Sequence, residues 1–343
     1  MKAVRFHQHG GPEVLRYEDA PDPAPAPGRA IVRVRACALN HLDLWERRGL
    51  GRVALPLPHI SGSDAAGEIV DAGGGELPSG TRVLLQPGLR CGRCRYCTQG
   101  RPHICARRTV LGIHRDGALA EYVAVPETNL VALPPGVSFE EAAIVESAST
   151  PYHALTARAP VAPGDPVAVI GVGGLGLHGV QVARILGATP IVAVDVSEPA
   201  LERALAAGAT HAVDARVQDP GAVVRALTDD EGVAVALECV GLPETCRWAV
   251  ESIRAGGIAA IVGIGPAPLE LIPTTVFARS EREVRGVYSY DLDEIRAVMQ
   301  LIADGALDAR LAISETYPLE DVNHGLESFR TKSRAPVRVL ITP

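Results

Sequence analysis

Four cysteines lie close together in residues 91–105, with the spacing C-x2-C-x2-C-x7-C: Cys91, Cys94, Cys97 and Cys105. Thiolates spaced this densely can surround one tetrahedral Zn²⁺, each at about 2.3 Å from the ion. Four protein ligands leave no open coordination position, so a site of this kind stabilises structure and does not activate a ligand. The spacing therefore predicts one structural Zn²⁺ per chain. The alternative is a group of reduced cysteines without metal.

A second candidate site is a glycine-rich stretch that follows the apolar segment VAVI and opens a helical pattern. It has the form G-x-G-x-x-G and consists of Gly171, Val172, Gly173, Gly174, Leu175 and Gly176. In a β-α unit the first glycine permits a tight turn, the second lets the backbone approach a pyrophosphate, and the third allows close helix packing. The helix N-terminus then faces the phosphates. The stretch predicts a dinucleotide site, and the alternative is a turn that binds nothing.

An acidic residue indicates which dinucleotide to expect. Asp195 ends the apolar segment IVAVD, 24 positions after Gly171. A carboxylate at about this distance accepts hydrogen bonds from the adenine-ribose hydroxyls and repels a 2′-phosphate. We therefore expect NAD(H) in preference to NADP(H).

The elements that must position these residues fall into two patterns. Residues 1 to about 146 read as short strands, rich in β-branched residues and bounded by Gly and Pro, so this half looks all-β. From residue 147 to about 285 strands alternate with helical stretches, which is typical of a parallel sheet with crossover helices. Two helices and a strand follow in 286–343. The predicted fold class is α/β, with a β domain followed by a doubly wound parallel sheet.

Composition restricts the kinds of partner. The chain has 33 basic and 40 acidic residues, a net charge of -7 and no block of Lys or Arg, so it lacks the electrostatic pattern of a protein that binds nucleic acid or an anionic membrane. No run approaches the roughly 18 apolar residues of a membrane helix, and MKAVRFHQHG lacks a secretion signal. Seven cysteines, four of them clustered, suit a reducing compartment. We expect a cytoplasmic protein with a small-molecule substrate.

Together, the GroES-like β half, the cysteine lobe at about 88–110, the stretch GVGGLG and the returning C-terminal segment resemble the medium-chain dehydrogenase/reductase superfamily, which includes zinc alcohol dehydrogenases and quinone oxidoreductases. The resemblance covers essentially the whole chain. It implies a GroES-like catalytic domain of residues 1–146 and 286–343 that encloses a Rossmann domain of residues 147–285, with the ligand cleft between them. It also implies a structural zinc on the four cysteines. A homodimer paired through 282–289 is the minimum assembly expected, and a homotetramer is the alternative.

The catalytic metal site of the zinc-dependent members is altered in this sequence. Asn40 stands at the place of a ligand cysteine, Ser63 at that of a ligand histidine and Asp64 at that of the adjacent glutamate. Only Glu146 remains at a ligand-compatible position, and Leu42 replaces the usual proton-relay Ser or Thr. An amide, a hydroxyl and one carboxylate are a poor set for Zn²⁺. We predict no catalytic zinc, although Asp64 and Glu146 could alternatively be a remnant pair that binds a divalent cation.

Without a Lewis acid, hydrogen-bond donors must stabilise the charge that develops on a hydride acceptor. Asn40, His41 and Ser63 are the candidate donors, with Asp64 and Glu146 beside them. The leading hypothesis is an NAD(H)-dependent oxidoreductase that acts on an activated carbonyl, enone or quinone. One alternative is a zinc-dependent alcohol dehydrogenase with unusual ligands, and the other is a protein that binds NAD(H) without turnover, as a sensor or structural protein.

The resemblance also assigns further residues to the cofactor. Those expected near the nicotinamide are Thr150, Val262, Ile264 and Ser289. Those expected on the adenine side are Val240 and Leu242. The positions expected at the pyrophosphate are His41 and Arg338, and for His41 ordinary packing is an equal alternative.

Overall fold

The computed structural model describes residues 1–49, 55–269, 271–331 and 337–343. The chain divides into two compact units. The first comprises Met1–Glu146, Asp291–Ala303 and Ile313–Pro343, and the second comprises Ser147–Tyr290 and Asp304–Ala312. No helix among the described residues is both long enough and apolar enough to cross a membrane.

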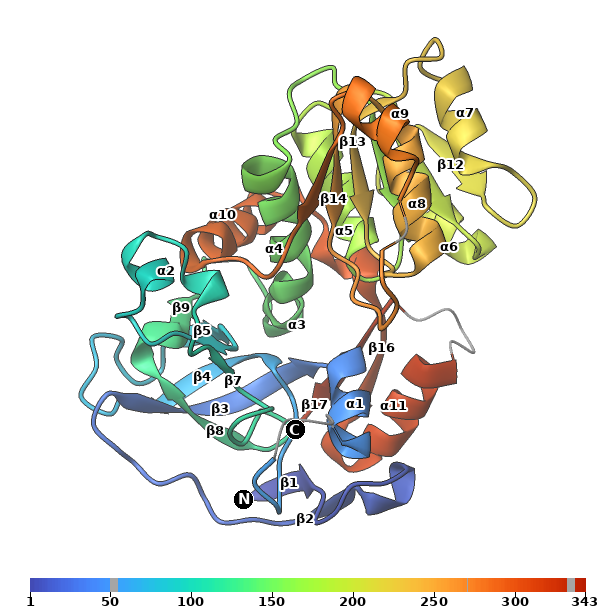
Figure 1. Cartoon of the computed structure of the whole chain (residues 1–343). Helices are drawn as coiled ribbons and strands as arrows, with labels where there is room; N and C mark the ends of the chain where they lie inside the picture. Colours follow the sequence, from blue (N-terminus) through green and yellow to red (C-terminus); the bar gives the residue numbers. More distant parts are fainter. Residues whose placement is uncertain (50–54, 270, 332–336) are drawn as a thin grey trace. The chain divides into compact units, whose positions relative to one another are not determined.

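A seven-stranded sheet forms the centre of the first unit (Figure 1). Its order is β16-β17-β3-β4-β5-β9, and β8 pairs with β3 outside this path. Two small antiparallel pairs, β1 with β2 and β6 with β7, also belong to this unit. Their bounds are β1 Lys2–Arg5, β2 Arg16–Asp19, β3 Arg29–Ala38, β4 Asp64–Asp71, β5 Arg82–Leu85, β6 Gly88–Leu89, β7 Thr109–Val110, β8 Tyr122–Pro126, β9 Leu130–Ala132, β16 Ile313–Pro318 and β17 Arg338–Thr342.

Helices also occur in the first half of the chain, so the expectation that this half is all-β is wrong. The reason is local capping: the backbone N–H of Asn40 donates to the Asp43 carboxylate, and Ser138 with Glu141 forms a complete capping box. The helices of this unit are α1 His41–Arg48, α2 Arg95–Thr98, α3 Phe139–Ala143, α10 Leu292–Ala303 and α11 Val322–Thr331, with 3₁₀ turns at Pro12–Val14, Pro102–Ile104, Glu127–Asn129 and Leu319–Asp321.

The second unit contains a six-stranded parallel sheet in the order β12-β11-β10-β13-β14-β15, which confirms the predicted α/β class and the doubly wound arrangement. Its strands are β10 Val167–Ile170, β11 Ile191–Asp195, β12 His211–Asp214, β13 Val233–Glu238, β14 Ile253–Ile261 and β15 Glu283–Gly286. The carboxyl ends of β10 and β13, where the strand order reverses, are adjacent, and this is where ligands bind in such sheets.

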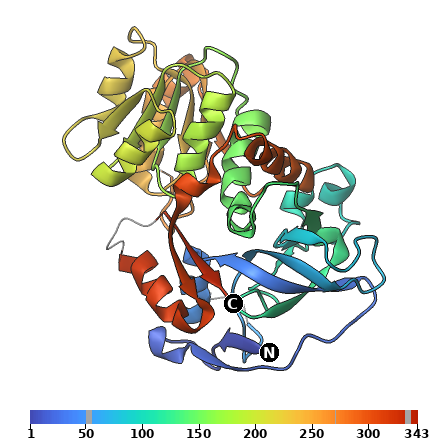
Figure 2. The same ribbon diagram turned by 180° about the vertical axis from the view of Figure 1, so that it is seen from behind.

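Helices cover both faces of this sheet. Figure 1 shows α8 on the near face, and Figure 2, seen from behind, shows α5 and α6 on the other. The burial of the strands explains their composition, since Val, Ile, Leu and Ala fill both faces of β10 and β13. The helices are α4 Val145–His153, α5 Gly176–Ile185, α6 Glu198–Ala206, α7 Pro220–Ala226, α8 Pro243–Ser252 and α9 Thr274–Arg279, followed by a π-helical turn at Ala154–Arg158 and a 3₁₀ turn at Ala309–Ala312.

The returning segment differs from the range expected from the sequence. Residues 286–290 and 304–312 belong to the second unit, although 286–343 as a whole was expected in the first domain. Two hydrogen bonds between Gln181 and the backbone of Asp308, and one from Arg184 to the carbonyl of Ala306, attach 304–312 to α5. These side-chain contacts follow no sequence periodicity, so helical and strand patterns alone do not reveal them.

Candidate functional site

The four clustered cysteines have the geometry of a closed metal site. Their sulfur atoms all lie within 4.8 Å of one another. The Sγ–Sγ distances are 3.5 Å for Cys94 and Cys97, 3.7 Å for Cys94 and Cys105, and 3.5 Å for Cys91 and Cys105. A tetrahedral ion with bonds of about 2.3 Å separates its sulfur ligands by about 3.8 Å. The four residues therefore fit a structural Zn²⁺.

Backbone groups of the same loop favour the thiolate form of two of these cysteines. The N–H of Arg93 lowers the pKa of Cys91 to about 6, and the N–H groups of Cys97 and Ala106 lower the pKa of Cys94. Desolvation and the neighbouring thiols instead raise the pKa of Cys97 to about 11. A bound cation would supply the positive charge that the remaining thiolates require.

Each glycine of the nucleotide fingerprint has a distinct environment at the start of α5. Gly171 has a φ of +81°, which L side chains rarely adopt. A Cβ at Gly176 would lie 1.9 Å from the carbonyl oxygen of Gly171, so the helix packs against the turn. A Cβ at Gly173 would have no atom within 4 Å among the described residues, so space is open there. Close packing at the third glycine and open space at the second match the geometry of a phosphate-binding turn.

Asp195 lies directly beside this turn. One carboxylate oxygen accepts a hydrogen bond from the backbone N–H of Val172 at 2.8 Å. The other accepts from the N–H groups of Val196 and Ser197 at 2.7 and 2.9 Å. The structure therefore brings the predicted ribose-binding carboxylate to the fingerprint.

Glu238 was not identified from the sequence, although it positions residues that were. It is fully buried at the end of β13, and its Oε1 accepts hydrogen bonds from the N–H groups of Val240 and Gly241 and from the Thr245 hydroxyl at 2.7–2.8 Å. This carboxylate fixes the loop that contains Val240 and Leu242. The sequence signal that could have identified Glu238 is its place as an acidic residue at the end of the apolar strand VAVALE.

The other residues predicted near the cofactor lie in the same unit. A Cβ on Gly241 would meet the backbone of Ile264 at 2.6 Å, so the loops after β13 and β14 touch. Val262 donates its N–H to the carbonyl of Glu238. Thr150 on α4 and Ser289 after β15 are buried.

In the first unit, three residues assigned to the catalytic site or the cofactor form one hydrogen-bonded chain. The Asn40 side-chain nitrogen donates to the Asp64 carboxylate at 2.9 Å, and Arg338 Nη1 donates to the Asn40 side-chain oxygen at 2.5 Å. Asp64 and Arg338 are buried. We call Asn40, Asp64 and Arg338 the amide network. Its two ends are separated in the sequence by most of the chain, so spacing did not predict the contact between Arg338 and Asn40.

Asp43 connects the residue that follows β3 with the segment that precedes β4. Its carboxylate accepts hydrogen bonds from the N–H of Asn40 at 2.7 Å and from the N–H of Gly62 at 3.2 Å. Ser63 follows Gly62, and its hydroxyl donates to the carbonyl of Leu111 at 2.8 Å. Asp43 therefore positions the backbone at both altered ligand positions.

These contacts do not fit a second Zn²⁺. Both ends of the Asn40 amide are engaged, the Ser63 hydroxyl is directed at a carbonyl, and the Arg338 guanidinium places positive charge 2.5 Å from the only amide oxygen that could act as a ligand. In the parts of the chain that the structure describes, the cysteine cluster is the only metal-like group of His, Cys, Asp and Glu.

Burial raises the pKa values of three acidic residues in this unit. It raises the pKa of Asp64 well above the ordinary value, and the nearby Glu146 adds to the shift, while Arg338 and Asn40 oppose it. It raises the pKa of Asp43 to about 6, against the opposing N–H groups of Asn40 and Gly62. It raises the pKa of Glu46 to about 9, and Asp43 adds to this shift. Glu146 itself is half-buried.

His41 lies on the exposed side of α1. Its ring centroid is 4.7 Å from that of Phe329 and 6.4 Å from that of Trp45. Ordinary packing was one of the two alternatives for His41, and the phosphate contact stays a prediction.

Comparison with known proteins identifies the family. Residues 26–135 match the model of the alcohol dehydrogenase GroES-like domain, and residues 174–304 match that of a zinc-binding dehydrogenase. Sorbitol dehydrogenase of Bacillus subtilis (strain 168) is 31% identical over 350 residues, which cover 100% of this chain and 97% of that protein.

Two solved structures resemble the chain along its whole length. One is an NAD-dependent alcohol dehydrogenase, with 32% identity, a TM-score of 0.91 and 100% coverage of both chains. The other is a zinc-binding dehydrogenase from Sinorhizobium meliloti 1021 bound to NADP, with 28% identity, a TM-score of 0.90, and coverage of 100% of this chain and 99% of that one. The two titles name different nicotinamide cofactors.

Proposed function

Because this chain belongs to the zinc-containing medium-chain dehydrogenase/reductase superfamily and is an NAD(P)-dependent oxidoreductase, we propose that it uses NAD(H) and transfers hydride without a catalytic zinc. Its substrate is an activated carbonyl, an enone or a quinone. Cys91, Cys94, Cys97 and Cys105 hold one Zn²⁺ whose role is structural, because four thiolates close the coordination sphere.

The amide network is the observation that carries the proposal. It places a buried guanidinium and a buried carboxyl group on the amide of Asn40, the residue that stands where zinc-dependent relatives have a ligand cysteine. Hydrogen-bond donors in a desolvated site stabilise a developing oxyanion or enolate. Delocalised charge, as in a reduced enone or quinone, needs less stabilisation than the alkoxide formed from an unactivated ketone. The network therefore suits conjugated acceptors.

Reduction also requires a proton. A bound nicotinamide supplies the hydride, and the acceptor then takes up one proton at oxygen or at the carbon next to the reduced one. Asp64 is buried beside Asn40, and burial raises the pKa of its carboxyl group well above the ordinary value, which favours the protonated form. We assign the proton to this carboxyl group, and Glu146 favours the protonated form because a second charge nearby would be repelled.

Cofactor preference rests on Asp195, whose carboxylate lies against the fingerprint and opposes a 2′-phosphate. In the first unit, the Nε of Arg338 is buried and has no hydrogen-bond partner among the described residues, which leaves a donor for an anionic group.

The deciding experiment combines metal analysis with turnover. Zinc content is measured on the purified protein, and NADH consumption is followed across a panel of enones, quinones, aldehydes and ketones. About one zinc per chain, with reduction of conjugated acceptors, supports the proposal. About two zincs per chain, with activity lost on selective chelation, would establish the zinc-dependent alcohol dehydrogenase that the names of the relatives favour.

A variant tests the assignment of the proton. Asp64→Asn keeps an acceptor for Asn40 and removes the titrating group. We expect kcat for reduction to fall by about 10² or more. Wild-type activity should decline as the pH rises through the raised pKa of Asp64, and this alkaline decline should be absent in the variant. Equal pH profiles for the two proteins would refute the assignment.

The proposed assembly is a homodimer. β15 is the edge of the parallel sheet and pairs with β14 alone among the described strands. Its other edge can pair with a second copy of the chain, which satisfies backbone groups that are otherwise exposed. Light scattering should give twice the 36.0 kDa mass of one chain, and a monomer would exclude this assembly.

A further inference from the structure

The strand next to Asp195 also ends in an acidic residue. In the parallel pair of β11 and β12, Asp195 is in register with Asp214, so the two residues lie side by side at the ligand-binding edge of the sheet. The backbone N–H of Ala215 donates to the carbonyl of Asp195 at 3.0 Å and attaches the turn after β12 to the end of β11. The proposed adenine-ribose site thus has two neighbouring acidic residues.

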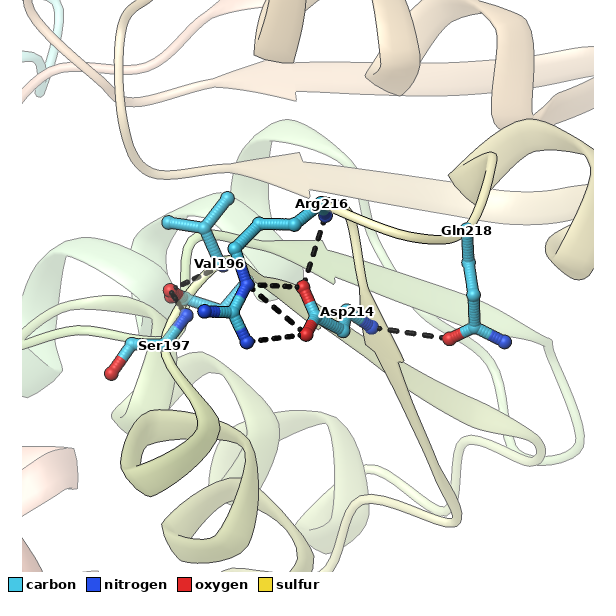
Figure 3. Close-up of polar contacts among 6 residues, drawn as sticks. Val196, Ser197, Asp214, Arg216 and Gln218 are labelled. Atoms are coloured by element: carbon cyan, nitrogen blue, oxygen red, sulfur yellow. Dashed lines mark hydrogen bonds and ion pairs between the residues drawn. The ribbon is translucent and has the colours of Figure 1, made fainter.

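Asp214 holds an arginine at this edge. Arg216 Nε lies 2.9 and 3.1 Å from the two carboxylate oxygens of Asp214, and its Nη2 lies 2.6 Å from the second (Figure 3). The backbone N–H of Arg216 donates to the same carboxylate at 2.9 Å, and Gln218 accepts from the N–H of Asp214 at 3.2 Å. In Figure 3 the guanidinium points toward Val196 and Ser197, the residues that follow Asp195.

The charges around Asp214 and Arg216 decide which ligand this edge of the sheet can bind. Asp195 contributes one negative charge, and Asp214 neutralises Arg216. Glu198, at the start of α6, lies near Arg216, and Arg203, further along α6, lies near Asp195. A guanidinium is the side chain best suited to a phosphate, since it can donate two parallel hydrogen bonds. Arg216 has the chemistry to receive a 2′-phosphate, but its Nε and Nη2 donate to Asp214, whose carboxylate also neutralises its charge.

We propose that Asp214 is a specificity residue that excludes NADP(H) by sequestering Arg216. This inference rests on the proposed NAD(H) dependence and adds a second determinant to Asp195. The arginine is half exposed, with a side-chain exposure of 56%, so it is accessible to a cofactor phosphate once released. Loss of the Asp214 charge converts the edge from net negative to neutral, and Arg216 becomes a phosphate receptor.

The test measures dissociation constants of NADH and NADPH, and of 5′-AMP and 2′,5′-ADP as adenine-side probes, on the full-length protein. The variants are Asp214→Asn, Arg216→Ala and the double variant. The chain offers a control in Asp308, because the same sequence, Asp-Ala-Arg, occurs there outside the sheet, and the backbone N–H and Nε of Arg310 donate to the Asp308 carboxylate at 3.0 and 3.3 Å. Asp308→Asn should change no cofactor ratio. Binding of 5′-AMP, which lacks the 2′-phosphate, verifies that each variant retains a folded site.

We expect Asp214→Asn to tighten NADPH and 2′,5′-ADP by about tenfold relative to NADH and 5′-AMP, with a smaller gain at high salt. The double variant should lose this gain. An unchanged ratio in Asp214→Asn, or a gain that persists in the double variant, would overturn the inference. Failure of the proposed function is a separate result, because it appears as absent NADH consumption and not in the binding ratio.

Discussion

The cysteine cluster and the amide network of the first unit stabilise negative charge in different ways. The four cysteines lie within 4.8 Å of one another and come from one loop. Backbone N–H groups lower two of their pKa values, and an external cation is needed to hold four thiolates together. The amide network contains its own cation, Arg338, which comes from a strand 298 residues away from Asn40.

This difference shows how an internal cation can neutralise buried acidic residues. A buried cluster of acidic residues must be neutralised by a metal, by protons or by a basic side chain. Asp43 and Asp64 are neutralised by protons and by a basic side chain. Burial raises the pKa values of both carboxyl groups, which favours protonation, and the guanidinium of Arg338 opposes that rise. The neutral amide of Asn40 links the cation to Asp64 without adding charge.

Removal of the internal cation should have the largest effect. Arg338→Met keeps an apolar stem and leaves the buried carboxyl groups without their guanidinium. We expect a loss of about 3–5 kcal/mol in the free energy of unfolding at pH 8. The loss should be smaller at pH 5, which lies below the pKa of about 6 of Asp43. Urea unfolding at the two pH values measures this, and equal losses would show that Arg338 does not act through charge.

Removal of one zinc ligand should have the next largest effect. Cys91→Ser should reduce zinc content to nearly zero and lower stability by about 3 kcal/mol, by analogy with a cross-link that closes a loop of this length. Protein that remains folded should retain turnover, because the ion is structural. Cys37→Ser, a buried cysteine of the same unit, should leave zinc content unchanged. A folded Cys91→Ser protein that had lost only turnover would contradict the structural role.

Removal of the amide should cost less than removal of the cation. Asn40→Ala deletes two hydrogen bonds and leaves donors on Arg338 and an acceptor on Asp64 unpaired, which should lower stability by about 1–3 kcal/mol. Zinc content should not change. Ser63→Ala, which deletes a single bond to a carbonyl, is the matched control with a smaller expected loss. A fall in zinc content in Asn40→Ala would mean that a metal binds at the amide network after all.

The smallest expected effect is a gain in stability, and it concerns Glu46. Both carboxylate oxygens of Glu46 are buried without a hydrogen bond among the described residues. The pKa of Glu46 is about 9 in the folded state against an ordinary 4.5, so folding takes up a proton and stability falls as the pH rises between these values.

Glu46→Gln cannot titrate and should therefore be more stable than the wild type by about 1–2 kcal/mol at pH 8, with the difference vanishing near pH 4. Urea unfolding across this range gives the curve. Parallel stability curves for the two proteins would show that Glu46 titrates normally in the folded state.

The sequence could predict features that depend on short spacing. The α/β class follows from the alternation of strands and helices after residue 147, and the cysteine spacing already implies sulfur atoms close enough for one ion. The helix α1 was missed because its start depends on a capping contact between Asn40 and Asp43, which a reading based on β-branched residues does not detect. The contacts of Arg338 with Asn40 and of Gln181 with Asp308 join distant segments, so no local pattern contains them.

The pairing of β17 with β3 also sets an order for events during synthesis. All strands of the second unit are contiguous in the chain from β10 to β15, so their sheet can form as soon as residue 286 has emerged. Arg338 follows Asn40 by 298 residues, and the synthesis of this segment takes roughly 15 to 60 s at about 5–20 residues per second. The hydrogen bond from Arg338 to Asn40 and the pairing of β17 with β3 can therefore form only after that interval.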